Sequence, residues 1–360
     1  MILKATFLRF LAEHYREEKS KKFDTAGEHT SGMLASLGRI SDPAFSSLCE
    51  IADSPPVNIL VEKADFINSS STLNFMKNSI LVMGYDVERY MTPEDRMSSL
   101  QGVKKIIALH RAYNVPFTFF MLGKLLEHDD YVAELKKELA LAGNLADVQQ
   151  HTYSHPLLKV NARYMREKNR QPISLPEIDM EIKKANQLIK DKLGVKVFGL
   201  KTPIGFHKGL QGEKAILDLL KKNGMRFVSS DLVGKGDQPP ALLEEEGLLR
   251  QHYVYENGLT EIPTHGWHDT HILLKNMSPY KNVKEACDYY RGELVKAHSK
   301  GMMYAPNLHP FVYSDRDHDP QASIVETFLS FAKANKMQVM SYAGYLEHTK
   351  RIDSPANQLS

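Results

Sequence analysis

Cysteine is scarce in this chain of 360 residues, and tryptophan occurs only once. The two cysteines, Cys49 and Cys287, lie far apart in the sequence. Two such residues cannot build a disulfide framework or a cysteine zinc cluster, so a reducing compartment is the simpler expectation. No Gly-x-Gly-x-x-Gly pattern follows a predicted strand, and the sequence therefore gives no support for a dinucleotide site.

Neither sign of charge dominates the composition. The chain has 46 Lys and Arg against 44 Asp and Glu, a formal net charge of +2. This balance creates no large basic field, and we expect no nucleic-acid partner. No segment approaches the roughly 20 apolar residues of a membrane span. Residues 1–23 show neither a continuous apolar run nor a small-residue cleavage site, so no signal peptide is visible and a cytoplasmic protein is expected.

The pattern along the chain changes near residue 76. The pattern predicts that residues 1–75 form a mostly helical extension, with Leu8, Leu11 and Tyr15 on one helix face before a stretch rich in Gly, Ser and Pro. Residues 76–345 form the main domain, and residues 346–360 a C-terminal tail. The extension is equally compatible with a dimer arm, a lid or simple packing, and homo-oligomerisation is left open.

Short apolar runs alternate with helical segments throughout the main domain. The predicted strands are Ile80–Tyr85, Val115–Met121, Asp147–Gln150, Val197–Leu200, Arg226–Ser229, Leu259–Ile262, Met302–Leu308 and Gln338–Ser341. The predicted helices are Pro93–Tyr113, Asp130–Leu141, Leu175–Leu193, Glu213–Asn223, Val283–His298 and Pro320–Asn335. Seven or eight such units favour an α/β fold of the (β/α) barrel type over an open sheet.

The most specific motif is His151-Thr-Tyr-Ser-His155, which is followed by Pro156. Two imidazoles four residues apart can bind one metal ion from a helix or from a loop. Pro156 disfavours helical backbone at His155, so the loop is preferred. A zincin helix would need Glu where Thr152 stands. Two histidines that merely pack or cap a loop are the ordinary alternative.

Two acidic residues, Asp86 and Glu88, follow the first predicted strand, at the edge where a barrel has its active site. One carboxylate together with two histidines is a suitable ligand set for Zn²⁺ or another divalent cation. The other carboxylate is then free to act as a base. Helix capping and a solvated charge are the alternatives for these two residues.

Two further segments end predicted strands. His309, in Asn307-Leu-His-Pro310, has a side chain suited to proton donation because imidazole titrates near neutral pH. The segment from Pro263 to His271 contains three histidines and Trp267. A loop lining the substrate is favoured there over a second metal site, and Trp267 is suited either to stacking on a sugar or to core packing.

Taken in order, these motifs resemble the NodB-homology polysaccharide deacetylases, carbohydrate esterase family 4. The resemblance rests on Asp86, the His151–His155 motif, Lys201-Thr-Pro-Ile-Gly205 and Leu308-His309-Pro310. It covers roughly residues 79–342 and implies a distorted NodB-like barrel.

The resemblance also implies roles for single residues. Asp86 resembles the catalytic base, His309 the general acid, and His151 and His155 the metal ligands. The family's usual second aspartate is replaced by Val87 and then Glu88, which makes Glu88 the expected third ligand. Lys201 stands in the position of the family arginine that holds the base, and lysine cannot make a two-pronged contact. Asp231 resembles the aspartate that tunes the general acid. The expected substrate-binding residues are Tyr153, whose backbone N–H would stabilise an oxyanion, Pro203, Gly205, Trp267, His268 and Asp269.

The implied activity is metal-dependent removal of an acyl group, most simply acetyl, from an N- or O-acylated carbohydrate. Zn²⁺ is the expected cofactor, and Co²⁺, Ni²⁺ and Mn²⁺ are compatible with the same ligands. An allantoinase-like deacylase of small amides is the alternative within the superfamily. A catalytically silent barrel that only binds carbohydrate is the alternative from another class.

Overall fold

The computed structural model describes residues 79–352. The predicted N-terminal extension and the helix expected in it lie outside the described residues, as does most of the predicted tail. The last described helix, Tyr342–Ile352, runs across the predicted boundary at residue 345. The three domain boundaries stay predictions.

The strands are short and most are buried. They are β1 Ile80–Val82, β2 Gly84–Val87, β3 Phe117–Met121, β4 Ala146–Gln150, β5 Gly199–Phe206, β6 Phe227–Asp231, β7 Glu244–Glu245, β8 Leu248–Leu249, β9 Tyr253–Val254, β10 Thr260–Glu261, β11 Met303–Tyr304 and β12 Gln338–Met340. The α-helices are α3 Pro93–Tyr113, α4 Asp129–Ala142, α5 Ala162–Lys168, α6 Leu175–Leu193, α7 Lys214–Lys222, α8 Asp269–Leu273, α9 Val283–Ser299, α10 Ser323–Ala334 and α11 Tyr342–Ile352.

The main sheet has the order β2-β3-β4-β5-β6-β10-β9, and every neighbouring pair is parallel except β10 and β9. Strand β1 precedes β2 directly and lies between β11 and β12, parallel to both. Tyr85 forms a parallel bridge with Leu308. The His265 N–H donates to Ala305 O at 2.7 Å, which joins the segments that follow β10 and β11. The strands thus form the predicted (β/α) barrel, with an irregular closure.

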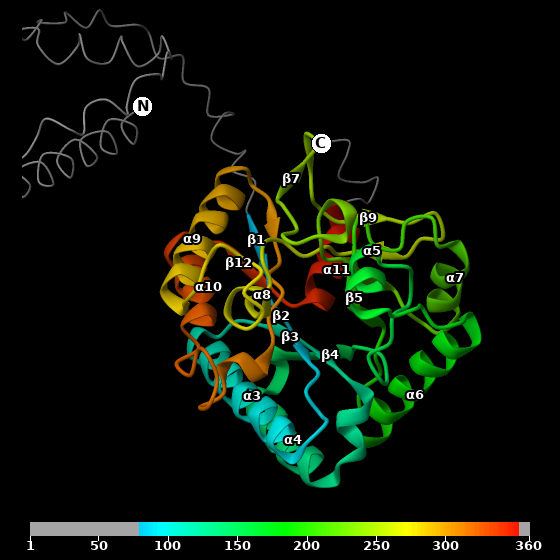
Figure 1. The fold of residues 1–360 in the computed structure, drawn as a ribbon. Coiled ribbons are helices and arrows are strands. Elements are labelled where there is room, and N and C mark those ends of the chain that lie inside the picture. The colour runs from blue at the N-terminus through cyan, green and yellow to red at the C-terminus, as the bar shows by residue number, and fades with distance from the viewer. Residues whose placement is uncertain (1–78, 353–360) are drawn as a thin grey trace, which may run out of the picture. The chain divides into compact units, whose positions relative to one another are not determined.

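Figure 1 shows the helices α3, α4, α6, α7, α9 and α10 arranged around the strands. Successive side chains of β3 point to opposite faces of the sheet, as in any β-strand. Phe117, Phe119 and Met121 belong to the larger core cluster, whereas Phe120 belongs to a second cluster. In that second cluster, Phe120 and Tyr342 have ring centroids 4.8 Å apart. The Lys201 Nζ atom lies 5.4 Å from the Phe120 ring centroid, so the polar site begins directly beside this aromatic layer.

Two helices begin and end where their capping residues predict. Before α3, the Thr92 hydroxyl accepts from the Asp95 N–H at 3.1 Å, and the Asp95 carboxylate accepts from the Thr92 N–H at 3.3 Å. Before α6, Ser174 and Glu177 form the same capping box, and Gly194 ends that helix with φ +73°. Such signals are local, which is why both helices were predictable to the residue.

Each of the eight predicted strands overlaps an observed strand, but the structure has twelve strands in the described residues and the predicted bounds are approximate. The first predicted strand is two short strands, β1 and β2. Strand β5 continues through the Lys201–Gly205 motif, with a register shift against β6 between Lys201 and Phe206. The strand predicted over Met302–Leu308 contains only β11, because residues 305–308 turn towards the site. The sequence pattern did not indicate α5, α8, α11, β9 or the β7–β8 hairpin.

None of the helices between residues 79 and 352 combines the length and the apolar character needed to cross a bilayer.

Gly102 on α3 offers a test of how the helix positions the site. A Cβ atom added there would lie 1.7 Å from the Pro310 carbonyl oxygen, in the short helix Pro310–Tyr313 that follows His309. We expect Gly102→Ala to lower the free energy of unfolding by about 1–3 kcal/mol through overpacking, measured by denaturant titration.

Gly292→Ala is the matched control, because Gly292 on α9 has no atom within 4 Å of an added Cβ. This substitution should stabilise the protein by roughly 0.5–1 kcal/mol. Equal effects of the two substitutions would contradict the close packing of α3 on the His309 segment.

Candidate metal and acyl-transfer site

The carboxyl ends of the parallel strands bring the predicted catalytic residues together. Glu88 follows β2, the two motif histidines follow β4, and His309 follows the bridge at Leu308. Asp86 and Lys201 lie within β2 and β5. This edge of a (β/α) barrel is where such folds carry their active sites.

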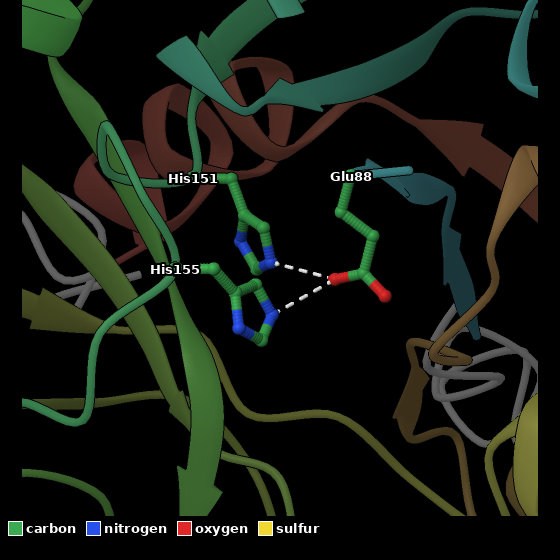
Figure 2. Close-up of side chains that lie close together, drawn as sticks. All are labelled: Glu88, His151 and His155. Carbon is green, nitrogen blue, oxygen red and sulfur yellow. Dashed lines mark hydrogen bonds and ion pairs between the residues drawn. The ribbon is translucent and has the colours of Figure 1, made fainter. Parts of the chain in front are cut away.

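Glu88, His151 and His155 form the one group between residues 79 and 352 whose ligand atoms could hold a metal ion. Their ligand atoms all lie within 4.8 Å of one another. The Nε2 atoms of His151 and His155 lie 3.2 Å and 3.0 Å from the same Glu88 oxygen, Oε2 (Figure 2). Burial acts to raise the Glu88 pKa, but the charges of His155 and His309 and the histidine hydrogen bonds lower that pKa well below its usual value.

The His151 ring is oriented by a backbone carbonyl. Its Nδ1 atom lies 2.9 Å from Lys201 O, so Nδ1 donates its proton to that carbonyl and Nε2 is the ring atom left to bind a metal ion. His155 has φ +65° and Thr152 has φ +62°, which confirms that the motif forms a loop and not a helix. The donor set of two imidazoles and one carboxylate fits a divalent cation such as Zn²⁺.

Glu181 on α6 fixes the histidine loop. One of its carboxylate oxygens accepts from the N–H groups of Tyr153 at 3.0 Å and Ser154 at 2.7 Å, and the other accepts from the Ser154 hydroxyl at 2.6 Å. The Tyr153 N–H is therefore occupied, which corrects the prediction that it stabilises an oxyanion. The Tyr153 hydroxyl donates to Glu127, also away from the ligands.

Lys201 is fully buried and forms an ion pair with Asp86, with Nζ 3.0 Å from Oδ1. The same ammonium group donates to Asn307 Oδ1 at 2.8 Å. Asp86 itself is only 3% exposed, and Lys201 is the cation that lies nearest to it among the described residues. Lysine thus holds the aspartate from the position of the family arginine, with one prong instead of two.

His309 is paired with Asp269. Its Nδ1 atom lies 2.6 Å from Asp269 Oδ1, and Asp269 Oδ2 accepts from the His309 N–H and the Tyr313 hydroxyl. Burial acts to lower the His309 pKa, but the charges of Asp269 and Glu88 outweigh it and raise that pKa above its usual value. The Nε2 atom lies 3.7 Å from Glu88 and 3.9 Å from Asp86.

This pairing corrects two predictions. Asp231 was expected to tune His309, but its carboxylate is paired with Arg250 and accepts from the Lys208 N–H. Asp269 was expected to contact substrate, but its side chain is fully buried against His309. A residue that follows a different strand, β10, therefore provides the function that had been expected of Asp231.

A pocket of about 310 Å³ opens beside these residues. Asp86, Glu88, His155 and His309 line it, and so do the predicted substrate-binding residues Pro203, Gly205 and His268. Trp267 is not among the lining residues. It is partly buried and packs against the larger core cluster, and its backbone N–H donates to the Tyr289 hydroxyl, which favours core packing over stacking on a sugar. His265 binds backbone groups of Arg250 and Ala305, so the histidine-rich segment forms no second metal site in the described part of the chain.

Three residues important to the site escaped sequence reasoning. Glu181 lies inside a helix, Asn307 precedes the LHP motif, and Asp269 was assigned another function. Asn307 was within reach, because it lies in the predicted strand Met302–Leu308, two residues before His309. Nothing in the sequence indicates that Glu181 faces the histidine loop, except that a carboxylate occurs among the buried positions of α6.

Comparisons with known proteins place this architecture in a class. Residues 90–228 match the family model described as polysaccharide deacetylase. The match contains both motif histidines and Lys201, whereas Asp86, Glu88 and His309 lie outside it. No curated protein matches the chain in sequence.

Solved structures share the fold. A Mycobacterium smegmatis protein assigned as a polysaccharide deacetylase has a TM-score of 0.55 and 18% identity, over 79% of this chain and 92% of its own. PuuE allantoinase has a TM-score of 0.53 and 13% identity, over 82% of this chain and 99% of its own. A Pseudomonas aeruginosa PAO1 protein, also assigned as a polysaccharide deacetylase, has a TM-score of 0.53 and 13% identity, over 78% of this chain and 93% of its own.

The polysaccharide deacetylase model that matches residues 90–228 indicates a hydrolase acting on C–N or ester bonds, and the solved structures share the barrel fold. Over residues 90–228 the chain is similar to the polysaccharide deacetylases, in agreement with the resemblance that its ordered motifs predict.

The contacts of Glu181 lead to a prediction. Glu181→Gln should weaken zinc binding about 10–100-fold, because residues that orient metal ligands usually contribute this much. Asp191→Asn, an exposed substitution on the same helix, should leave zinc affinity unchanged. Competition with a chromophoric chelator measures both constants, and an unaltered affinity in the Glu181 variant would show that the loop does not need this anchor.

Proposed function

We propose that this protein is a metal-dependent deacylase that removes an acyl group, most simply acetyl, from an N- or O-acylated carbohydrate. The main support is the position of Asp86 and His309 beside the Glu88, His151 and His155 cluster in one pocket. A binding barrel without activity would have no need for a base, an acid and a ligand set in this arrangement.

The three ligands would hold the cation and leave further coordination positions for water and substrate. When bound, such a cation polarises a carbonyl group and lowers the pKa of water from 15.7 towards about 7. Zn²⁺ is the proposed ion, and Co²⁺, Ni²⁺ or Mn²⁺ would accept the same ligands.

Asp86 is the proposed base. Its Oδ1 atom is held by Lys201, and its Oδ2 atom faces His309 at 3.9 Å. One oxygen is thus committed to orientation while the other is available to accept a proton from the attacking water. Positioned proton transfer of this kind typically accelerates a reaction by about 10²–10⁴-fold.

His309 is the proposed proton donor to the leaving amine or alcohol. The Asp269 carboxylate holds the ring through Nδ1, so Nε2 is directed towards the acidic groups at the pocket. The nearby negative charges favour the protonated imidazole, which is the form a general acid needs.

A deacylase of small amides is the second candidate, and one observation favours it. The pocket volume of about 310 Å³ suits a single small molecule or one sugar unit better than several consecutive units of a polymer.

The experiment that tests these proposals is a substrate screen with the purified protein. Acetylated amino sugars and their oligomers are compared with ureides and formamides, and acetate, formate or ammonia release is measured with and without a chelator. Release that stops with the chelator and returns with Zn²⁺ is the expected result. Absence of hydrolysis with every substrate, in protein loaded with metal, would refute the deacylase function.

Two substitutions separate metal binding from chemistry. His155→Ala should abolish both zinc binding and turnover, because it removes a ligand. Asp86→Asn should retain zinc and lose roughly 10²–10⁴-fold in kcat, because it removes only the base. Zinc content and kcat are measured on the same samples, and near-normal turnover in either variant would contradict the corresponding function.

A cytoplasmic location and self-association remain predictions. Fractionation of the native host and sedimentation of the full chain would test them.

A further inference from the structure

Arg163 on α5 is a buried cation that lines the pocket of the proposed active site. The residue is 5% exposed, and its buried Nε atom has no hydrogen-bond partner among residues 79–352. The guanidinium contacts within residues 79–352 are a long bond from Nη1 to Met277 Sδ, 3.7 Å, and an aromatic contact with Tyr164 at 5.2 Å. Neither contact supplies negative charge, and Arg163 has no ion pair with a described residue.

The carboxylates that line this pocket are engaged elsewhere. Asp86 is paired with Lys201, and Glu88 lies between the two motif histidines. A buried charge without a counter-charge is costly, so proteins normally pair it or use it to bind a ligand.

The surroundings of Arg163 add further positive charge and another unsatisfied polar atom. Lys275 lines the same pocket and is exposed to solvent. His271 stacks on His268 with ring centroids 4.2 Å apart, and its buried Nδ1 atom has no hydrogen-bond partner in the part of the chain that the structure describes. Burial, followed by the charges of His268, Lys275 and Arg163, lowers the His271 pKa well below its usual value. His271 is therefore neutral, and its contribution to a ligand would be a hydrogen bond and not a charge.

We infer that Arg163 binds a carboxylate carried by the substrate, with Lys275 and His271 beside it, so that the enzyme prefers anionic acylated substrates. This inference rests on the proposed deacylase function of the same site and specifies the class of its substrate. The planar guanidinium matches a carboxylate with two parallel hydrogen bonds, and its unsatisfied Nε–H is one of the donors available. A neutral substrate would leave Arg163 buried and unpaired, which gives the site a physical basis for rejecting it.

Matched pairs of compounds test the inference on the zinc-loaded full chain. N-acetylglucosaminuronate is compared with N-acetylglucosamine, and N-acetylalanine with N-acetylalaninamide, because each pair differs mainly in the negative charge. Dissociation constants are measured by calorimetry, and kcat/KM by acetate release. We expect at least one anion to bind tenfold or more tightly than its neutral partner, and Arg163→Met to reduce this ratio to near one.

Arg166→Met is the matched control, because Arg166 lies on the same helix and is exposed. It removes the same charge from the protein and should leave the ratio unchanged. Lys275→Met, at an exposed position, should reduce the ratio in part and provides a second variant should Arg163→Met fail to fold.

The outcomes separate the inference from the function on which it rests. Preferential binding of the anion without hydrolysis would support the inference and count against the deacylase function. Hydrolysis of both members of each pair at equal kcat/KM, with equal dissociation constants, would overturn the inference and leave the function standing. Binding of neither member would also overturn the inference. N-acetylglucosamine 6-phosphate forms a further arm, and preference for it over both carboxylates would show that the anion bound is a phosphate.

Discussion

The negative charge of Glu88 is the constraint around which the site is organised. One oxygen of this carboxylate lies within 3.2 Å of the Nε2 atoms of both His151 and His155, and the other lies 3.7 Å from His309. Groups that carry or attract positive charge thus converge on one acidic side chain at the end of β2. Neighbouring positive charge keeps a carboxylate ionised, and an ionised carboxylate beside two imidazoles is a suitable ligand set for a divalent cation.

The barrel explains how residues far apart in sequence reach this charge. Parallel strands end at one edge, so Asp86, the histidine loop and Lys201 meet although more than a hundred residues separate the first from the last. Each of these groups is then fixed by a partner that takes no direct part in the proposed chemistry. Glu181 holds the histidine loop, Lys201 O orients His151, and Asp269 holds His309. Such support is what distinguishes a preorganised site from a chance cluster of polar residues.

Sequence reasoning recovered the parts of this arrangement that depend on local signals. Capping boxes define α3 and α6, and the proline after His155 defines the loop. Sequence reasoning could not predict which polar side chains form contacts with each other across the edge of the barrel. Asp231 and Asp269 both follow strands next to the site, and only the path of the chain after β10 brings Asp269 to His309. The sequence also could not show that the Tyr153 N–H donates to Glu181, because Glu181 lies on a separate helix, α6. The aromatic character of Trp267 was compatible with sugar binding or with the core, and packing against the core cluster favours the core.

The most direct test of the central claim is X-ray absorption at the zinc edge of the purified protein, loaded with one equivalent of Zn²⁺. A site formed by Glu88, His151 and His155 predicts scattering from two imidazole rings with nitrogen at about 2.0–2.1 Å, together with oxygen ligands at about 2.0–2.2 Å. A spectrum with oxygen neighbours only, or with no imidazole scattering, would show that these two histidines do not share a metal ion and would contradict the account.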